Sequence, residues 1–280
     1  MNNLNDFIKQ SISEDCPTID ITTSSINLVN QNIEAKLIAK ENGIFFGHNI
    51  IKSAVNLYSN MTEKNTIKDG SYLKKGDIIS LISGQHNDIL LLERTLLNFI
   101  QHLSGIATST QKAVQTLNNP KISICDTRKT IPGFRKLAKA AVKAGGGKNH
   151  REGLSDMILI KENHLTILEK ENRLDQLSSY IKTAKNQSAS LKAQIEIETV
   201  SQLKEFDLTI FDYILLDNFS IDDIPNAVEI ALKHNFNGEI ECSGNITHNN
   251  LSNYTHLPIQ RISMGCLTHS VTAFDISLLL

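Results

Sequence analysis

The sequence predicts an α/β protein in which a mixed α+β domain is followed by a larger domain of alternating strands and helices. From residue 121 onward, six short apolar segments alternate with helical segments, as is typical of parallel strands joined by crossover helices. Polar residues stand at or just past the carboxyl end of each apolar segment. In parallel α/β folds this rim is where ligands bind and chemistry takes place.

The first domain is expected to contain short strands and one long helix. Residues 33–40 alternate between apolar and polar side chains like a half-buried strand, and glycine-containing turns separate further short strands between 66 and 84. Residues 88–118 carry apolar side chains at helical spacing, with Gly105 as a candidate break into two helices. We place residues 1–110, joined by the C-terminal segment 270–280, in this domain and residues 111–269 in the second.

The second domain is expected to contain six parallel strands, and a short extra strand near Gly145-Gly146-Gly147 would make seven. That number suits an incomplete α/β barrel, while an open doubly wound sheet produces the same pattern. The predicted strands are 122–125, 158–160, 193–197, 213–216, 240–242 and 262–264, and the predicted helices lie near 134–144, 166–187, 200–206, 221–234 and 248–254.

Composition narrows the function classes. The net charge is −2, with no tail or stripe of like charge, so nucleic-acid binding is not expected. No apolar run approaches the roughly 20 residues that span a bilayer, and the polar N-terminal stretch lacks the core of a signal peptide. The four cysteines form no CxxC pair, which favours reduced thiols over a zinc site. We therefore expect a cytoplasmic protein.

A dense basic cluster stands out within residues 125–151 of this near-neutral chain. It includes Arg128, Lys129, His150 and Arg151, together with the triple glycine. Guanidinium groups offer a planar fork to carboxylates and phosphates, and glycines let backbone N–H groups approach an anion. The cluster predicts a pocket for a small ligand that carries more than one negative charge.

Two carboxylates, Glu198 and Asp217, follow successive predicted strands and should lie side by side. Such a pair can bind ribose hydroxyls, hold Mg²⁺ through oxygen ligands and water, or stabilise a cationic sugar. Glu196 lies two residues before Glu198 and therefore shares its face of the strand. A supporting role in the site and a purely structural role explain it equally well.

The loops after the last two predicted strands have the composition of a phosphate site. One contains Ser243 and Gly244, and the other contains Gly265 and His269. Late loops of α/β barrels that open into helices commonly bind phosphate. Beside the two carboxylates, they suggest a phosphorylated sugar.

Several motifs in this order resemble the quinolinate phosphoribosyltransferase family, the decarboxylating nicotinate-nucleotide pyrophosphorylases. The resemblance covers nearly the whole chain. The motifs are Glu93-Arg94-Thr95, Leu103-Ser104-Gly105-Ile106-Ala107-Thr108, Asp126-Thr127-Arg128-Lys129-Thr130-Ile131-Pro132-Gly133, Gly145-Gly146-Gly147 with Asn149-His150-Arg151, Ile160-Lys161, Leu215-Leu216-Asp217-Asn218-Phe219 and Leu267-Thr268-His269-Ser270.

The resemblance implies an N-terminal α/β sandwich, an open α/β barrel and a homodimer whose active sites are shared between subunits. It implies the substrates quinolinate and phosphoribosyl pyrophosphate, the products nicotinate mononucleotide, pyrophosphate and CO2, and Mg²⁺ held near Glu198 and Asp217 through pyrophosphate and water. Position by position, the quinolinate pocket would be lined by Thr127, Arg128, His150, Arg151 and Lys161, with Arg94 from the partner subunit. The phosphoribosyl pyrophosphate site would take Lys129, Glu198, Asp217, Ser243, Gly244, Gly265 and His269, and Lys129, Glu198 and Asp217 would be catalytic.

Two departures from the family pattern are visible, at Ala144 and at Asn245, where the family often has cysteine and glycine. Asparagine tolerates left-handed backbone, so the loop at Asn245 can keep its shape. The alternatives are a related phosphoribosyltransferase-like protein of a molybdenum-transport context, a Schiff-base aldolase using Lys129 or Lys161, and a non-catalytic binding protein.

Overall fold

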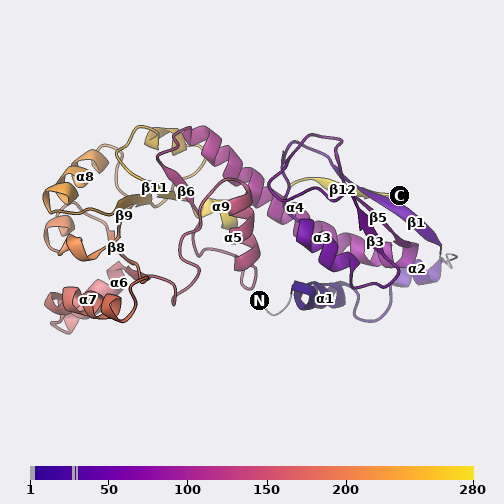
Figure 1. Cartoon of the computed structure of the whole chain (residues 1–280), viewed down its shortest axis with the longest axis horizontal. Helices are drawn as coiled ribbons and strands as arrows, with labels where there is room; N and C mark the ends of the chain where they lie inside the picture. The colour runs from indigo at the N-terminus through magenta and orange to yellow at the C-terminus, as the bar shows by residue number, and fades with distance from the viewer. Residues whose placement is uncertain (1–3, 27–28, 30) are drawn as a thin grey trace. The chain divides into compact units, whose positions relative to one another are not determined.

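The computed structural model describes residues 4–26, 29 and 31–280, which form two compact units (Figure 1). The first unit comprises residues up to Gln111 together with Lys136–Gly146 and Val271–Leu280. The second comprises Lys112–Arg135 and Gly147–Ser270. Among the described residues, none of the helices combines the length and apolar character that crossing a membrane requires.

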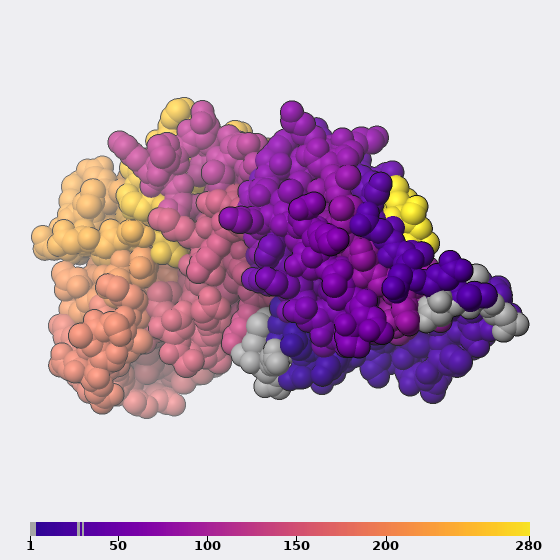
Figure 2. All heavy atoms as spheres, turned by 45° about the vertical axis from the view of Figure 1, so that its right-hand side comes forward, coloured from indigo at the N-terminus to yellow at the C-terminus, as the bar shows by residue number. Residues whose placement is uncertain are grey.

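A four-stranded antiparallel sheet forms the centre of the first unit, in the order β12-β1-β5-β3. The C-terminal strand β12 pairs with β1, and Figure 2 shows the yellow C-terminal residues against the indigo and purple surface of this unit. The sheet strands are β1 (Asn32–Ala39), β3 (Thr62–Lys64), β5 (Ile78–Gln85) and β12 (Ile276–Leu279), with β2 (Gly43–Ile44) and β4 (Tyr72–Leu73) in a separate pair.

This unit contains α1 (Leu4–Asp15), α2 (Ile21–Ser25), α3 (His48–Val55), the long α4 (His86–Leu117) as far as Gln111, and α5 (Arg135–Ala144) from Lys136 onward. The expected break of α4 at Gly105 is wrong, because the helix is continuous. A Cβ at Gly105 would lie 2.3 Å from the carbonyl oxygen of Thr272, so glycine serves close packing against the C-terminal segment.

Close packing also explains the first glycine of the triple-glycine motif. A Cβ at Gly145, just beyond α5, would lie 2.2 Å from the carbonyl oxygen of Ala107 on α4. Gly146 has a φ of 89°, which few other residues adopt. Within the first unit, these two glycines thus serve packing and chain reversal.

The second unit contains a six-stranded parallel sheet in the order β6-β11-β10-β9-β8-β7. Figure 1 labels four of these strands, β6, β11, β9 and β8. Its strands are β6 (Ser123–Cys125), β7 (Ile158–Ile160), β8 (Ala193–Ile197), β9 (Tyr213–Asp217), β10 (Glu239–Ser243) and β11 (Arg261–Ser263). The described residues therefore form an α/β fold with a separate antiparallel sheet, and their parallel strands do not close into a barrel. Only one parallel bridge, Cys125 to Lys148, stands where an extra strand near the glycines was predicted.

Helices and short 3₁₀ turns follow the strands, and their apolar faces pack on the sheet around buried residues such as Ile195, Ile214 and Ile262. They are α6 (Glu162–Lys170), α7 (Leu177–Gln187), α8 (Ile224–Lys233) and α9 (Cys266–His269), with turns at Leu174–Gln176, Gln202–Lys204, Leu208–Ile210 and Leu251–Tyr254. The sheet order brings the carboxyl ends of all six strands to one rim.

Candidate active site

The rim residues predicted from the sequence come together because the strands that carry them are hydrogen-bonded neighbours. Ser243 on β10 pairs directly with Asp217 on β9, and Glu198 follows Ile197, the neighbour of Leu216. Lys161 follows β7 at the edge beyond β8. Residues far apart in the sequence therefore line one continuous edge.

A cavity of about 260 Å³ opens at this rim. Six of the seven residues predicted for phosphoribosyl pyrophosphate line it, as does Thr127, whereas Glu198 does not. Asn218, Ile246, Thr247, Ser263 and Cys266, which sequence reasoning did not assign, also line it. The complete lining is Thr127, Lys129, Asp217, Asn218, Ser243, Gly244, Asn245, Ile246, Thr247, Ser263, Gly265, Cys266 and His269.

The loop after β10 is shaped to expose its backbone. Gly244 has a φ of 92°, and a Cβ there would lie 2.2 Å from Oδ1 of Asn218, so only glycine fits. Asn245 has a φ of 51°, as its tolerance of left-handed backbone allows. The backbone N–H of Thr247 donates to Oδ1 of Asn250 at 2.8 Å, which closes the turn.

Lys129 is held by its backbone while its exposed side chain reaches the cavity. The hydroxyl of Thr268 donates to the Lys129 carbonyl oxygen at 2.8 Å, and the Lys129 N–H donates to Oγ1 of Thr127 at 3.0 Å. A Cβ at Gly265 would lie 2.9 Å from Nε2 of His269 and 3.2 Å from Cδ of Lys129. Glycine at 265 therefore leaves room for a lysine and a histidine to approach the same anion.

Arg128 and Arg151 form a pair of neighbouring guanidinium groups. Burial, and then the charge of Arg128, lower the pKa of Arg151, whose Nη1 donates to the Met157 carbonyl oxygen at 3.3 Å. Nε of Arg128 is buried and has no hydrogen-bond partner among the described residues. A bound anion would offset the repulsion between the two guanidinium groups and would accept a hydrogen bond from the buried Nε of Arg128.

His150 directly precedes Arg151, and both of its ring nitrogens face protein atoms. Its Nδ1 accepts a hydrogen bond of 2.8 Å from the Arg151 backbone N–H, so a neutral ring carries its proton on Nε2. Nε2 lies 3.4 Å from Oε1 of Glu241. His150 thus contributes to the arginine pair indirectly, by holding the backbone of Arg151.

Sequence reasoning missed Glu241, whose side chain is fully buried. Its Oε2 accepts hydrogen bonds from Nε of Arg261 at 3.0 Å and from Nε2 of Gln194 at 3.2 Å. Burial by itself raises the pKa of Glu241, but His150, Arg261 and Ser263 together lower it to about 2. A charged residue between Ile240 and Cys242 in an apolar strand was the sequence signal for this network.

The carboxylates near β8 form a crowded acidic group. Lys161 makes an ion pair with Glu196. Burial raises the pKa of the exposed Glu198, as do the charges of Glu162, Glu196 and Asp217. Within residues 4–26, 29 and 31–280, no group of three or more His, Cys, Asp or Glu side chains is arranged to hold a metal ion.

Arg94 lies on α4 in the first unit and its side chain is exposed. Burial raises the pKa values of Cys125 and Cys242 to about 12, so neither of these thiols is ionised near neutral pH. Cys266, which lines the rim cavity, is partly buried, and burial raises the pKa of its thiol as well.

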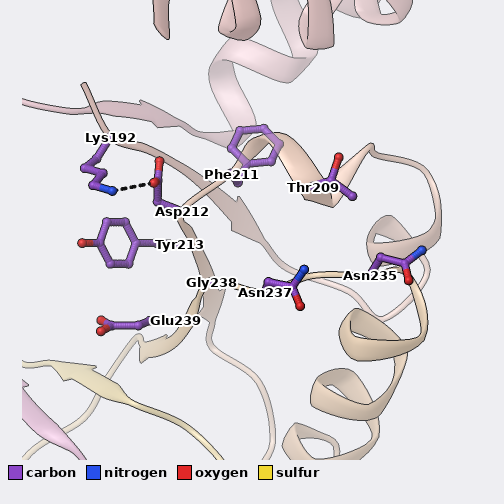
Figure 3. A pocket seen from close by; sticks show the side chains of 9 residues that line it. All are labelled: Lys192, Thr209, Phe211, Asp212, Tyr213, Asn235, Asn237, Gly238 and Glu239. Carbon is purple, nitrogen blue, oxygen red and sulfur yellow. Dashed lines mark hydrogen bonds and ion pairs between the residues drawn. The ribbon is translucent and has the colours of Figure 1, made fainter. Parts of the chain in front are cut away.

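A second cavity of about 410 Å³ opens at the opposite, amino ends of β8, β9 and β10 (Figure 3). Its main charged group, Asp212, is already paired with Lys192 at 2.9 Å and with Lys185 at 2.6 Å. It is larger than the rim cavity, but its charges are compensated and it lies away from the carboxyl ends. We therefore place the candidate active site at the rim cavity.

Comparison with known proteins identifies the family of the chain. Residues 20–104 match the family described as quinolinate phosphoribosyl transferase, N-terminal domain, and residues 106–279 match its C-terminal domain. A probable nicotinate-nucleotide pyrophosphorylase [carboxylating] of Bacillus subtilis is 41% identical over 270 residues, covering 95% of this chain and 89% of the relative. A quinolinate phosphoribosyltransferase [decarboxylating] of Nicotiana tabacum is 34% identical over 98% of this chain and 81% of its own.

The fold agrees as well. The solved structure of the nicotinate-nucleotide pyrophosphorylase from Francisella tularensis superposes with a TM-score of 0.88 at 34% identity. The match covers 99% of this chain and 95% of that one.

Proposed function

The chain belongs to the quinolinate phosphoribosyltransferase family, and we propose that it converts quinolinate and phosphoribosyl pyrophosphate into nicotinate mononucleotide, pyrophosphate and CO2 in NAD biosynthesis. One observation in this chain carries the proposal. The guanidinium pair of Arg128 and Arg151 adjoins the loop that supplies Thr127 and Lys129 to the rim cavity. A dianionic aromatic acid and a diphosphate sugar could thus bind side by side.

Quinolinate would bind at the arginine pair. Its two ring carboxylates offer acceptors to the unsatisfied Nε of Arg128 and to the guanidinium of Arg151. His150 would keep Arg151 in place through the backbone hydrogen bond. Lys161 would add a cation at the rim, although Glu196 already offsets part of its charge.

Phosphoribosyl pyrophosphate would bind in the rim cavity. The exposed backbone at Ser243 and Gly244, the position of Gly265 and the side chains of Lys129 and His269 suit its diphosphate. Asp217 and Glu198, at the ends of neighbouring strands, suit its ribose hydroxyls.

The chemistry requires positioning and charge stabilisation. The pyridine nitrogen of quinolinate forms a bond to the anomeric carbon, while the bond from that carbon to the diphosphate oxygen breaks and its electron pair leaves with diphosphate. Asp217 and Glu198 stabilise the positive charge that develops on the sugar. The bond to the 2-carboxylate then breaks, its electrons enter the cationic ring, and a proton replaces CO2 on that carbon.

Mg²⁺ fits this site as an ion held through substrate. Burial, and then the charges of neighbouring carboxylates, raise the pKa of Glu198. The repulsion among these carboxylates favours a cation near Glu198 and Asp217, yet the described side chains form no metal cage. Diphosphate and water would supply the other oxygen ligands, and the bound ion would offset the charge on diphosphate.

The decisive experiment measures nicotinate mononucleotide and CO2 formed by the purified protein from quinolinate, beside nicotinate as substrate. Nicotinate lacks one carboxylate and would leave cationic donors unpaired, at a cost of about 2–5 kcal/mol. We expect a much lower kcat/KM for nicotinate. Equal values for the two acids would contradict the assignment of the arginine pair.

A Schiff-base aldolase has less support. The lysine of a Schiff-base enzyme must have its amine free to attack a carbonyl, whereas the Lys161 amine is engaged in an ion pair with Glu196. Borohydride should therefore trap no carbonyl substrate on the protein.

We further propose that the protein is a homodimer in which Arg94 completes the quinolinate pocket of the partner subunit. Arg94→Ala and Arg151→Ala homodimers should each be nearly inactive. In a heterodimer of the two variants, one site would hold both substitutions and the other neither, so roughly half of the activity per dimer should return. Native mass spectrometry would verify the exchange, and inactive heterodimers would contradict the shared site.

A further inference from the structure

Asn218 makes contacts in two directions from its place directly after β9. Its Nδ2 donates a hydrogen bond of 2.7 Å to Oδ2 of Asp217. Its Oδ1 accepts a hydrogen bond of 3.0 Å from Nδ2 of Asn245, in the loop after β10. The Asn218 backbone N–H also donates to the carbonyl oxygen of Ser243 at 2.9 Å. One side chain therefore touches both a rim carboxylate and the loop proposed for diphosphate.

The chemistry of the partners sets the orientation of the Asn218 amide. An ionised carboxylate only accepts hydrogen bonds, so the NH2 group must face Asp217. The carbonyl oxygen then faces Asn245, whose NH2 group can donate. If the amide were flipped, its carbonyl oxygen would face the Asp217 carboxylate, and its NH2 group would face the NH2 group of Asn245. Both hydrogen bonds therefore require the observed orientation.

The backbone around this contact has little freedom. Asn218 and Asn245 both have left-handed conformations, with φ angles of 55° and 51°. Gly244 packs so closely against Asn218 that a Cβ at 244 would lie 2.5 Å from its Cγ. The Asn245 carbonyl oxygen accepts a hydrogen bond of 3.0 Å from Nδ2 of Asn250, which anchors the far side of the loop.

We infer that Asn218 is a positioning residue that couples the Asp217 carboxylate to the loop at Gly244, and that Asn245 is its partner in this coupling. The pair holds the ribose side and the diphosphate side of one substrate in register. The inference rests on the proposed function and adds two residues to it. The inference also assigns a role to the Asn245 side chain. The left-handed backbone at this position does not by itself require that side chain.

Two substitutions separate the two contacts. Asn245→Gly keeps a residue suited to left-handed backbone and removes only the side chain that donates to Asn218. Asn218→Asp is isosteric and retains an acceptor for Asn245, but it replaces the donor to Asp217 with a second carboxylate. Asn235→Gly is the matched control, because Asn235 has a φ of 59° and lines the cavity at the opposite end of the strands.

The measurements are calorimetric titrations with inorganic pyrophosphate and with quinolinate, and steady-state kinetics in phosphoribosyl pyrophosphate. For Asn245→Gly we expect pyrophosphate affinity to fall about three- to tenfold, as loss of one hydrogen bond predicts. For Asn218→Asp we expect a rise in KM for phosphoribosyl pyrophosphate and a fall in kcat, each of about tenfold. Quinolinate affinity should change less than about twofold in all variants.

The comparison of the two ligands distinguishes positioning from general support of the fold. A disturbed fold would weaken the binding of quinolinate and of pyrophosphate together. Loss of positioning should weaken pyrophosphate binding and leave quinolinate binding close to that of the wild type.

Two results would overturn the inference. The first is wild-type pyrophosphate affinity in both Asn218→Asp and Asn245→Gly. The second is an equal loss of quinolinate and pyrophosphate affinity, which would indicate a disturbed fold. If the wild-type protein forms nicotinate mononucleotide and its variants behave in these ways, the results contradict only the coupling. A wild-type protein without turnover contradicts the proposed function, and the inference fails with it.

Discussion

The substitution Glu241→Gln should lower the free energy of unfolding and should make that free energy depend less on pH. In the folded protein the pKa of Glu241 is about 2, compared with an ordinary value of 4.5. The difference corresponds to about 3 kcal/mol of unfolding free energy contributed by the ionised carboxylate at neutral pH. The isosteric amide carries no charge and directs its NH2 group toward the donors of Arg261 or His150. We therefore expect a loss of about 3 kcal/mol at pH 7.

The pH dependence has a definite sign. Because the folded-state pKa lies below the unfolded one, the contribution of Glu241 is complete well above pH 4.5 and disappears as pH falls through the folded pKa near 2. By pH 3 it should fall to about half or less of its neutral value. The stability difference between wild type and Glu241→Gln should narrow over the same interval.

Urea unfolding followed by far-ultraviolet circular dichroism, at several pH values between 7 and 3, measures this difference. The matched control is Glu239→Gln on the same strand. The Glu239 side chain is 52% exposed and lies 3.7 Å from the Arg261 that also binds Glu241. Exposed ion pairs contribute little, so Glu239→Gln should change stability by less than about 1 kcal/mol. Equal effects of the two substitutions, or a pH-independent gap, would refute the reasoning.

Three further predictions concern packing and the site. Gly105→Ala places a Cβ 2.3 Å from the Thr272 carbonyl oxygen and should destabilise the protein by about 1–3 kcal/mol in thermal unfolding, whereas Gly153→Ala, which meets nothing within 4 Å, should change little. Asp217→Asn should lower kcat far more than it weakens quinolinate binding, because its charge acts as the sugar becomes cationic; a variant that loses only quinolinate affinity would move Asp217 to the other half of the site. Arg128→Met should weaken quinolinate binding at least about tenfold in calorimetry while pyrophosphate affinity is kept, and equal losses for both ligands would contradict this division.

Local patterns in the sequence were sufficient for the strands. The bounds predicted for 158–160 and 193–197 coincide with β7 and β8, because each is an apolar run between polar segments. The rim residues followed from the same logic, since a parallel sheet brings the carboxyl ends of its strands to one edge. Local patterns did not show that the helix continues through Gly105. Glycine is needed there because the position packs closely against Thr272, which lies far along the chain.

The sequence by itself determined the family, the parallel sheet and the residue types at its rim, because these depend on periodicity and on motifs of neighbouring residues. Only the tertiary structure decided which way His150 faces, that Glu241 is buried between His150 and Arg261, and that Asn218 joins Asp217 to Asn245. Each of these arrangements depends on hydrogen bonds between residues from different strands and loops. Their partners are chosen by the register of the sheet and by the exclusion of water from its interior, and neither property belongs to any single segment.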